Sequence, residues 1–255
     1  MALFIDGPIS DAADLQRYEN DILSVASAEG IELGAKIILA QHDLADEVLK
    51  FLLRRSSCRD STSAFRRTRE VNDVVVSEPM RQWHVHKTLA LVYRDAYDNQ
   101  LNDRYQGKWQ EYEKLARASK ATCFQIGVGL VADPVPKAPS PTLTGVVGSA
   151  SGGTFYAAVT WLNAAGQEGS PSDFVQLVTS NGEQLVVAVS GPPDNVTGWN
   201  VYVGLSPATV SLQNQGPLIP SSSWTMNSGP NPGARLPAGQ PPSWFIVDHR
   251  VIERG

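Results

Sequence analysis

One long segment of the chain lacks most of the side chains that perform chemistry. Residues 138–242 contain no lysine, no histidine, no cysteine and a single arginine, Arg235. The rest of the chain carries 20 of the 21 lysines and arginines. Because acid–base and nucleophilic catalysis relies heavily on the missing residue types, the segment favours a structural or binding role over an enzymatic one. The break in composition also predicts two different domains in one polypeptide.

Other shortages exclude further classes of protein. Two cysteines, Cys58 and Cys123, are too few for a disulfide framework, which favours folding in an intracellular compartment. The first residues lack the basic segment and apolar core of a secretory signal, and no apolar run approaches the about 18 residues of a membrane span. The net charge of −5 argues against a protein built mainly to coat nucleic acid.

The first half of the chain has the apolar spacing of amphipathic helices. We expect four helices, at residues 10–29 with Ser10 as the cap, at 32–55, after the capping residue Ser77, and at 103–123. Between the second and third helices the pattern disappears over residues 56–76, with a short β-segment expected at 74–76. Four amphipathic helices predict a small bundle.

The second half of the chain changes to the alternating pattern of strands. The proline-rich residues 133–141 predict a stiff linker. After it, strands are expected at residues 154–162, 174–179, 184–190, 199–203 and 223–226, separated by turns rich in glycine, proline and asparagine. Short strands at this spacing predict a small β-sandwich.

The last residues regain charge and have strong β propensity. Residues 244–252, with the sequence WFIVDHRVI, predict a strand that has no evident place in the sandwich. We expect this tail to return to the helical half or to bind another subunit, which makes the sandwich an insertion. An exposed apolar strand of this kind is an association site.

The residues that could carry catalysis or bind a metal do not form a site. His84 and His86 project about 200° apart on a helix, so they cannot chelate one metal ion and are expected at the surface or in packing. His249 beside Asp248 has no nucleophile partner. The carboxylates of the second half are too dispersed for paired acid–base chemistry: Glu168, Asp173, Glu183 and Asp194. We therefore expect no catalytic, cofactor or metal site.

A basic cluster follows the second expected helix. It contains Arg54, Arg55, Arg59, Arg66, Arg67 and Arg69. Three interpretations remain open. The cluster is a solvated loop, it contacts DNA phosphates in a salt-sensitive way, or it pairs with carboxylates of an acidic protein surface.

Two resemblances extend this interpretation. The helical segments ISDAADLQRYENDILSVASAEGI, LAQHDLADEVLKFLLRR and LALVYRDAYDNQLNDRYQGKWQEYEKLA resemble head-to-tail connector (adaptor) proteins of tailed bacteriophages, over roughly residues 1–130 and the C-terminal tail. The segments FYAAVTWLNAAGQEGSPSDF and GWNVYVGLSP resemble immunoglobulin-like or fibronectin-III-like modules found inside phage structural proteins, over roughly residues 140–240.

The resemblance implies an α+β multidomain protein. Its parts are a helical, four-helix bundle-like adaptor domain at 1–132, a linker at 133–141, an immunoglobulin-like β-sandwich at 142–240 and an extended β tail at 241–255. Such a protein is a non-enzymatic structural component of the virion without cofactors, assembled in the host cytoplasm. Twelve copies form a ring in the neck, at the head–tail interface.

The same resemblance implies the partners of the ring. These are the portal protein, the next neck or tail protein and, without sequence specificity, the genomic DNA. The tail reaches the portal through Trp244, Phe245, Ile246, Val247, His249, Arg250, Val251 and Ile252. The alternative is a tail or surface decoration protein whose sandwich binds a host-cell glycan through the aromatic residues Trp161, Trp199, Tyr202 and Trp224.

Overall fold

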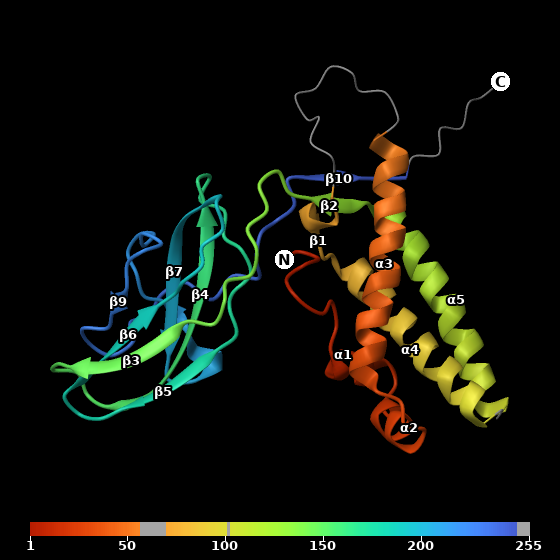
Figure 1. Cartoon of the computed structure of the whole chain (residues 1–255), viewed down its shortest axis with the longest axis horizontal. Helices are drawn as coiled ribbons and strands as arrows, with labels where there is room; N and C mark the ends of the chain where they lie inside the picture. Colours follow the sequence, from red (N-terminus) through yellow and green to blue (C-terminus); the bar gives the residue numbers. More distant parts are fainter. Residues whose placement is uncertain (57–69, 101–102, 249–255) are drawn as a thin grey trace. The chain divides into compact units, whose positions relative to one another are not determined.

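The protein is an α+β protein with most of its helices in the first half of the chain and most of its strands in the second. The computed structural model describes residues 1–56, 70–100 and 103–248, apart from the side chains of residues 55 and 56 (Figure 1). The chain divides into two compact units. The helical unit comprises Gly7–Val131 and Pro242–Gly255, and the sheet unit comprises Met1–Asp6 and Ala132–Pro241.

The described part of the helical unit contains five α-helices, rather than the four expected. They are α1 (Ala12–Tyr18), α2 (Ile22–Ala28), α3 (Leu33–Ser56), α4 (Glu78–Gln100) and α5 (Asp103–Ile126). The helix α4 contacts each of the other four. Its sequence explains this central place, because buried side chains from Met80 to Ala96 occur on nearly every side of the helix.

The single helix expected at residues 10–29 is broken into α1 and α2, which corrects the sequence-based prediction. Asp11, not Ser10, caps α1, with its carboxylate accepting from the Asp14 backbone N–H at 2.9 Å. Glu19 ends α1 in an extended conformation, with φ −142° and ψ 96°. Its carboxylate accepts hydrogen bonds from Lys108 at 2.7 Å and from the Tyr112 hydroxyl at 2.8 Å. These distant partners stabilise the break.

The long helices agree with their apolar patterns. The stripe expected on the second helix is buried in α3: Ile37, Ala40, Leu44, Val48, Phe51 and Leu52. The helix α4 begins at Glu78, directly after Ser77, as expected. The helix α5 begins at Asp103 and extends to Ile126, three residues beyond the expected end.

A small antiparallel sheet completes the helical unit. Its strands lie in the order β1 (Val74–Val75), β2 (Val128–Leu130) and β10 (Trp244–Ile246), with Gly129 paired to both Val75 and Phe245. A side chain at Gly129 would meet the Pro242 ring at 3.0 Å, so this position requires glycine. The tail therefore returns to the helical unit. Its strand spans three residues, shorter than the expected 244–252, of which 249–252 lie outside the described residues.

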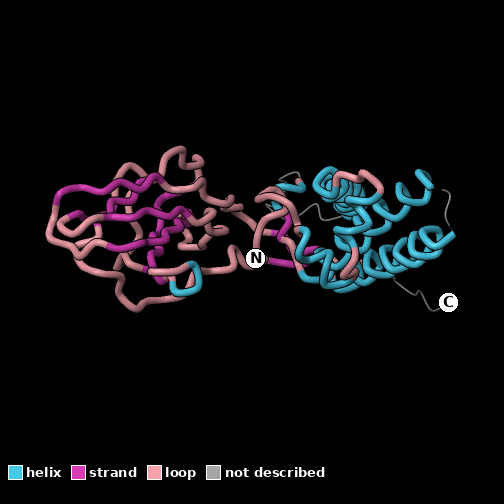
Figure 2. The backbone as a smooth tube through the Cα atoms, turned by 90° about the horizontal axis from the view of Figure 1, so that it is seen from below, coloured by secondary structure: helices cyan, strands magenta, loops and turns pink. Residues whose placement is uncertain are grey.

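The sheet unit consists of two antiparallel sheets that share one core (Figure 2). The first has the order β3 (Thr142–Val147), β6 (Glu183–Ala188) and β9 (Trp224–Thr225). The second has the order β5 (Val175–Thr179), β4 (Gly153–Asn163), β7 (Val196–Gly204) and β8 (Ser211–Leu212). Alternate residues of β4 point into the core as the sequence predicts: Phe155, Ala157, Val159 and Trp161.

Two segments differ from their expected roles. The proline-rich residues 133–141 are not a free spacer, because Val135 and Ala138 are buried in the core of the sheet unit. Residues 1–6, which the sequence places with the helices, also pack with the sheets. The Asp6 carboxylate holds them there by accepting 2.7 Å hydrogen bonds from the backbone N–H groups of Leu3 and Lys137 and from the Ser170 hydroxyl.

Candidate functional site

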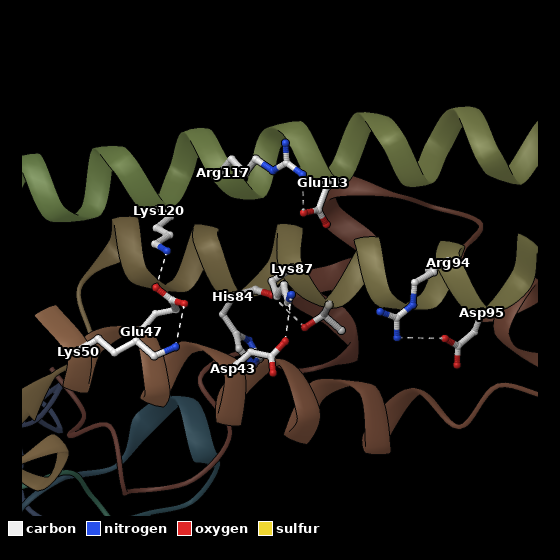
Figure 3. Close-up of polar contacts among 11 residues, drawn as sticks. Asp43, Glu47, Lys50, His84, Lys87, Arg94, Asp95, Glu113, Arg117 and Lys120 are labelled. Atoms are coloured by element: carbon white, nitrogen blue, oxygen red, sulfur yellow. Dashed lines mark hydrogen bonds and ion pairs between the residues drawn. The ribbon is translucent and has the colours of Figure 1, made fainter. Parts of the chain in front are cut away.

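One candidate site is a charged groove in the helical unit, lined by α3, α4 and α5 (Figure 3). It consists of two adjoining cavities of about 420 Å³ and about 330 Å³, which share Glu47, Lys50 and Lys120. We call it the α3–α5 groove and define it by the residues Asp43, Asp46, Glu47, Lys50, Phe51, Arg54, Trp83, Lys87, Glu113, Arg117, Lys120, Phe124 and Asp248.

Helical spacing places these charges on one flank of each helix. Asp43, Glu47 and Lys50 follow one another at intervals of four and three residues on α3, and Glu113, Arg117 and Lys120 do the same on α5. Each set lies beside the buried stripe of its helix, so the charges border the contact with α4. The groove thus results from two charged flanks that α4 holds apart.

Ion pairs connect the walls of the groove. The Glu47 carboxylate contacts the Lys120 ammonium at 2.6 Å across the groove and the Lys50 ammonium at 3.3 Å along α3 (Figure 3). The hydrogen bond from Lys120 lowers the pKa of Glu47, although partial burial opposes this. Lys87 on α4 pairs with Asp43 at 3.0 Å. Glu47 is therefore ionised at neutral pH and joins α3 to α5.

The floor of the groove is aromatic. Trp83 is buried beneath it, and the Lys120 ammonium lies 6.0 Å from the centre of the Trp83 ring. Phe51 and Phe124 stack with ring centres 4.5 Å apart and planes 10° apart. The larger cavity is lined by four acidic and four basic side chains. This balance does not select an ion of one sign and suits a polar protein surface better than a phosphate group.

The structure brings together the ends of two segments that the sequence singles out. Arg54, the first arginine of the basic cluster, and Asp248, in the tail, line the same cavity. The Asp248 backbone N–H donates to the Phe124 carbonyl at 3.0 Å. The Arg55 side chain and Arg59, Arg66, Arg67 and Arg69 lie outside the described residues, as do His249, Arg250, Val251 and Ile252.

The described residues of the tail differ in exposure. Trp244, Ile246 and Val247 are partly buried, whereas Phe245 is 52 % exposed. Ile126, at the end of α5, is 54 % exposed. A side chain at the next residue, Gly127, would lie 3.2 Å from the Phe245 Cβ atom, so the chain that leaves α5 passes close to Phe245. Ile126 and Phe245 both present apolar surface near the edge strand β10.

The two histidines of α4 are packing residues. The Nε2–H group of His84 donates to the Ile37 carbonyl at 3.0 Å, because a carbonyl can only accept. Its Nδ1 atom then accepts from the Ser10 hydroxyl at 2.7 Å. Burial lowers the pKa of His84 to about 4, so the ring is neutral at pH 7. His86 contacts the Ser119 hydroxyl at 2.8 Å, and burial lowers its pKa too.

The described residues contain no group of three histidine, cysteine or acidic side chains arranged to hold a metal ion. Cys123 is a buried free thiol, and burial raises its pKa to about 11. Cys58 lies outside the described residues.

The four aromatic residues that the glycan alternative invokes do not form an exposed platform. Trp161, Trp199 and Tyr202 are buried, and Trp224 is partly buried against the same core. The Trp199 indole N–H donates to the Ile219 carbonyl at 3.0 Å. These side chains therefore stabilise the unit from inside and do not offer the stacking surface that the glycan alternative requires.

Glu168 has a structural role that the sequence does not reveal. Its Oε1 atom accepts hydrogen bonds from the Tyr202 hydroxyl at 2.7 Å, from the Asn200 amide at 2.9 Å and from the Thr160 hydroxyl. Burial raises the pKa of Tyr202 and keeps it a donor. Of the other carboxylates, Asp173 pairs with Lys137 at 2.7 Å, and Glu183 accepts from the Ser180 backbone at 2.7 Å.

The chain matches no protein-family model, and no curated protein sequence is significantly similar to it. Within the described ranges, no helix is both long and apolar enough to cross a lipid bilayer.

Proposed function

We propose that the protein is a head-to-tail adaptor of a tailed bacteriophage, a structural virion protein that forms a ring below the portal and joins the capsid to the tail or neck. One observation supports this most directly. The strand β10 pairs with β2, so the sheet unit is inserted between two parts of one helical unit. An adaptor body with an accessory domain has this organisation.

The sheet unit is proposed to be an immunoglobulin-like β-sandwich on the outside of the ring. Two antiparallel sheets with a shared core that contains Trp161 and Trp199 are in keeping with this architecture. The unit also carries few of the cations that attract nucleic acid. Between residues 138 and 242 it carries one arginine and no lysine. A position away from DNA follows from this charge.

The tail is proposed to contact the portal and the basic cluster to contact either DNA or an acidic protein surface. Phe245 supports the first proposal, because a half-exposed aromatic ring on an edge strand is an apolar anchor for a partner. Arg54 supports the second, because the cluster begins beside the tail at the same cavity.

The test is binding to purified portal rings, followed by electron microscopy. We expect a second ring stacked on the portal with knobs outside it. Replacement of Phe245 by serine together with removal of residues 249–255 is expected to abolish binding. This change keeps β10, whose loss would expose β2. The matched control is Ile219→Ser, which alters a 68 % exposed residue of the sheet unit. Equal binding by both variants would refute the role of the tail.

A further inference from the structure

The helix α3 has a second apolar face, opposite its core. Three large aliphatic side chains on this face are exposed: Ile38 at 53 %, Leu49 at 37 % and Leu53 at 53 %. Because successive residues of a helix turn by about 100°, Ile38, His42, Ala45, Leu49 and Leu53 form one stripe on the flank away from the α3–α5 groove. We call these five residues the α3 seam.

The helix α5 has a complementary face. Leu115, Ala118, Thr122 and Ile126 form a stripe on the flank away from the groove, and we call them the α5 seam. Leu115 is 37 % and Ile126 is 54 % exposed. Between them lie only small residues, and the Thr122 hydroxyl donates to the Ala118 carbonyl at 3.1 Å. Because that hydroxyl is satisfied within the helix, the middle of the seam is largely apolar in character.

The two seams differ in side-chain size and are bordered by opposite charges. The α3 seam carries bulky aliphatic side chains, and the middle of the α5 seam carries small ones, a combination that lets two helices pack closely. One exposed charged residue follows each seam on the side toward the groove: Asp46 on α3, which itself lines the edge of the groove, and Lys114 on α5. Neither has a hydrogen-bond or ion-pair partner within the part of the chain that the structure describes.

We propose that the α3 seam of one copy binds the α5 seam of a second copy of this chain. The two faces differ, so the contact is heterologous, and each copy keeps one seam open for the next. Such a contact continues until it closes into a ring. It therefore deepens the proposed function by naming the surfaces between neighbouring copies. A single helix–helix contact lies at the small end of stable interfaces, below about 1,200 Å², so free copies should associate reversibly.

The test is sedimentation velocity of the full chain over a series of concentrations. Leu49→Glu with Leu53→Glu alters the α3 seam, and Ala118→Arg alters the α5 seam. All three residues are at least partly exposed, so both variants should fold. We expect each variant alone to associate at least about tenfold more weakly than the wild type, because a charge enters the contact. The matched control Ile219→Glu should associate like the wild type.

Mixing gives the decisive result. Each variant keeps the seam that the other has lost, so an equimolar mixture should form dimers that do not grow further. Charge reversal adds a second measurement: Asp46→Lys should weaken association, and Lys114→Asp in the same chain should restore it. A symmetric contact would give no rescue on mixing, and a wild-type chain that stays monomeric at about 1 mM has no such contact. Either result overturns the proposal.

This experiment separates the interface from the adaptor role. A chain that associates through its seams but ignores portal rings leaves the interface standing and removes the proposed function. Complete rings of the seam variants on a portal would remove the interface alone.

Discussion

Replacement of Glu168 by alanine should destabilise the sheet unit by about 2–4 kcal/mol. The change removes the acceptor of three donors. Thr160 and Tyr202 are essentially inaccessible to water, at 0 % and 2 % exposure, so after the loss of the carboxylate their hydroxyl groups could interact only with each other and with Asn200. A buried donor left unsatisfied costs about 1–3 kcal/mol, so two cost about 2–6 kcal/mol, and the remaining interaction between Tyr202 and Thr160 places the expected loss in the lower half of that range. The Asn200 amide N–H would also lose its acceptor, while the Asn200 side-chain oxygen would still accept from the Asn214 amide at 2.8 Å.

The assay is urea unfolding with hydrogen exchange of peptides from β4 and β7, which reports on the sheet unit alone. Glu168→Gln keeps an oxygen acceptor and should cost about 1 kcal/mol. Asp194→Ala, at an exposed carboxylate, is the control and should cost less than about 0.5 kcal/mol. If Glu168→Ala resembles this control, or if glutamine is as harmful as alanine, the hydrogen bonds do not stabilise the unit as described.

Two further predictions concern single buried contacts. The lowered pKa of His84, about 4 in the folded chain and 6.5 unfolded, favours the neutral ring, so its contribution is complete above pH 6.5 and is lost as the pH falls toward 4. From thermal unfolding at each pH, the free energy of unfolding of the helical unit should fall by about 3 kcal/mol more in the wild type than in His84→Asn over that interval. Parallel plots of this free energy against pH for the two proteins would contradict the prediction. Asp6→Ala should cost the sheet unit about 2–3 kcal/mol and leave exchange in α3 and α5 unchanged, because Asp6 holds three donors of the sheet unit. Faster exchange in those helices would place Asp6 with the helical unit.

The sequence predicts elements whose signal is local. The stripe from Ile37 to Leu52 specifies α3, because each residue is spaced for one helical face and each is buried. The break between α1 and α2 has no such signal. The carboxylate of Glu19 is held by Lys108 and Tyr112, roughly ninety positions away in sequence. Apolar spacing alone continues through the break and predicts one helix.

The strands show the same limit. The alternation in β4 is clear because one face is packed in the core, whereas β3 is exposed at nearly every residue and offers no pattern. Its pairing with β6, from Thr142 with Ala188 to Val147 with Glu183, comes from backbone hydrogen bonds that do not depend on side-chain polarity. The strand β8 has only two residues, too few for a periodic signal.

The candidate groove could be predicted in part. Charges at intervals of three and four residues on α3 and α5 are visible in the sequence, and they predict a polar flank on each helix. That the two flanks face each other across α4 depends on tertiary packing. The contact between Glu47 and Lys120, 73 residues apart, has no sequence signal of its own.

The insertion of the sheet unit poses a folding problem that the structure solves at both of its ends. Pairing β10 with β2 closes a loop of roughly 110 residues, which costs about 4 kcal/mol of chain entropy if the loop is unfolded. Within the sheet unit, Gln240 is fully buried and joins the entering and leaving segments, accepting from the Val135 N–H at 2.9 Å and donating to the Asp133 carbonyl at 2.9 Å. A folded sheet unit therefore already holds its two ends together. The strand that completes the helical unit is then delivered close to β2, where the Ser243 N–H donates to the Leu130 carbonyl at 2.8 Å. The domain that carries few reactive side chains thus contributes to assembly of the helical unit by bringing the C-terminal tail to its place.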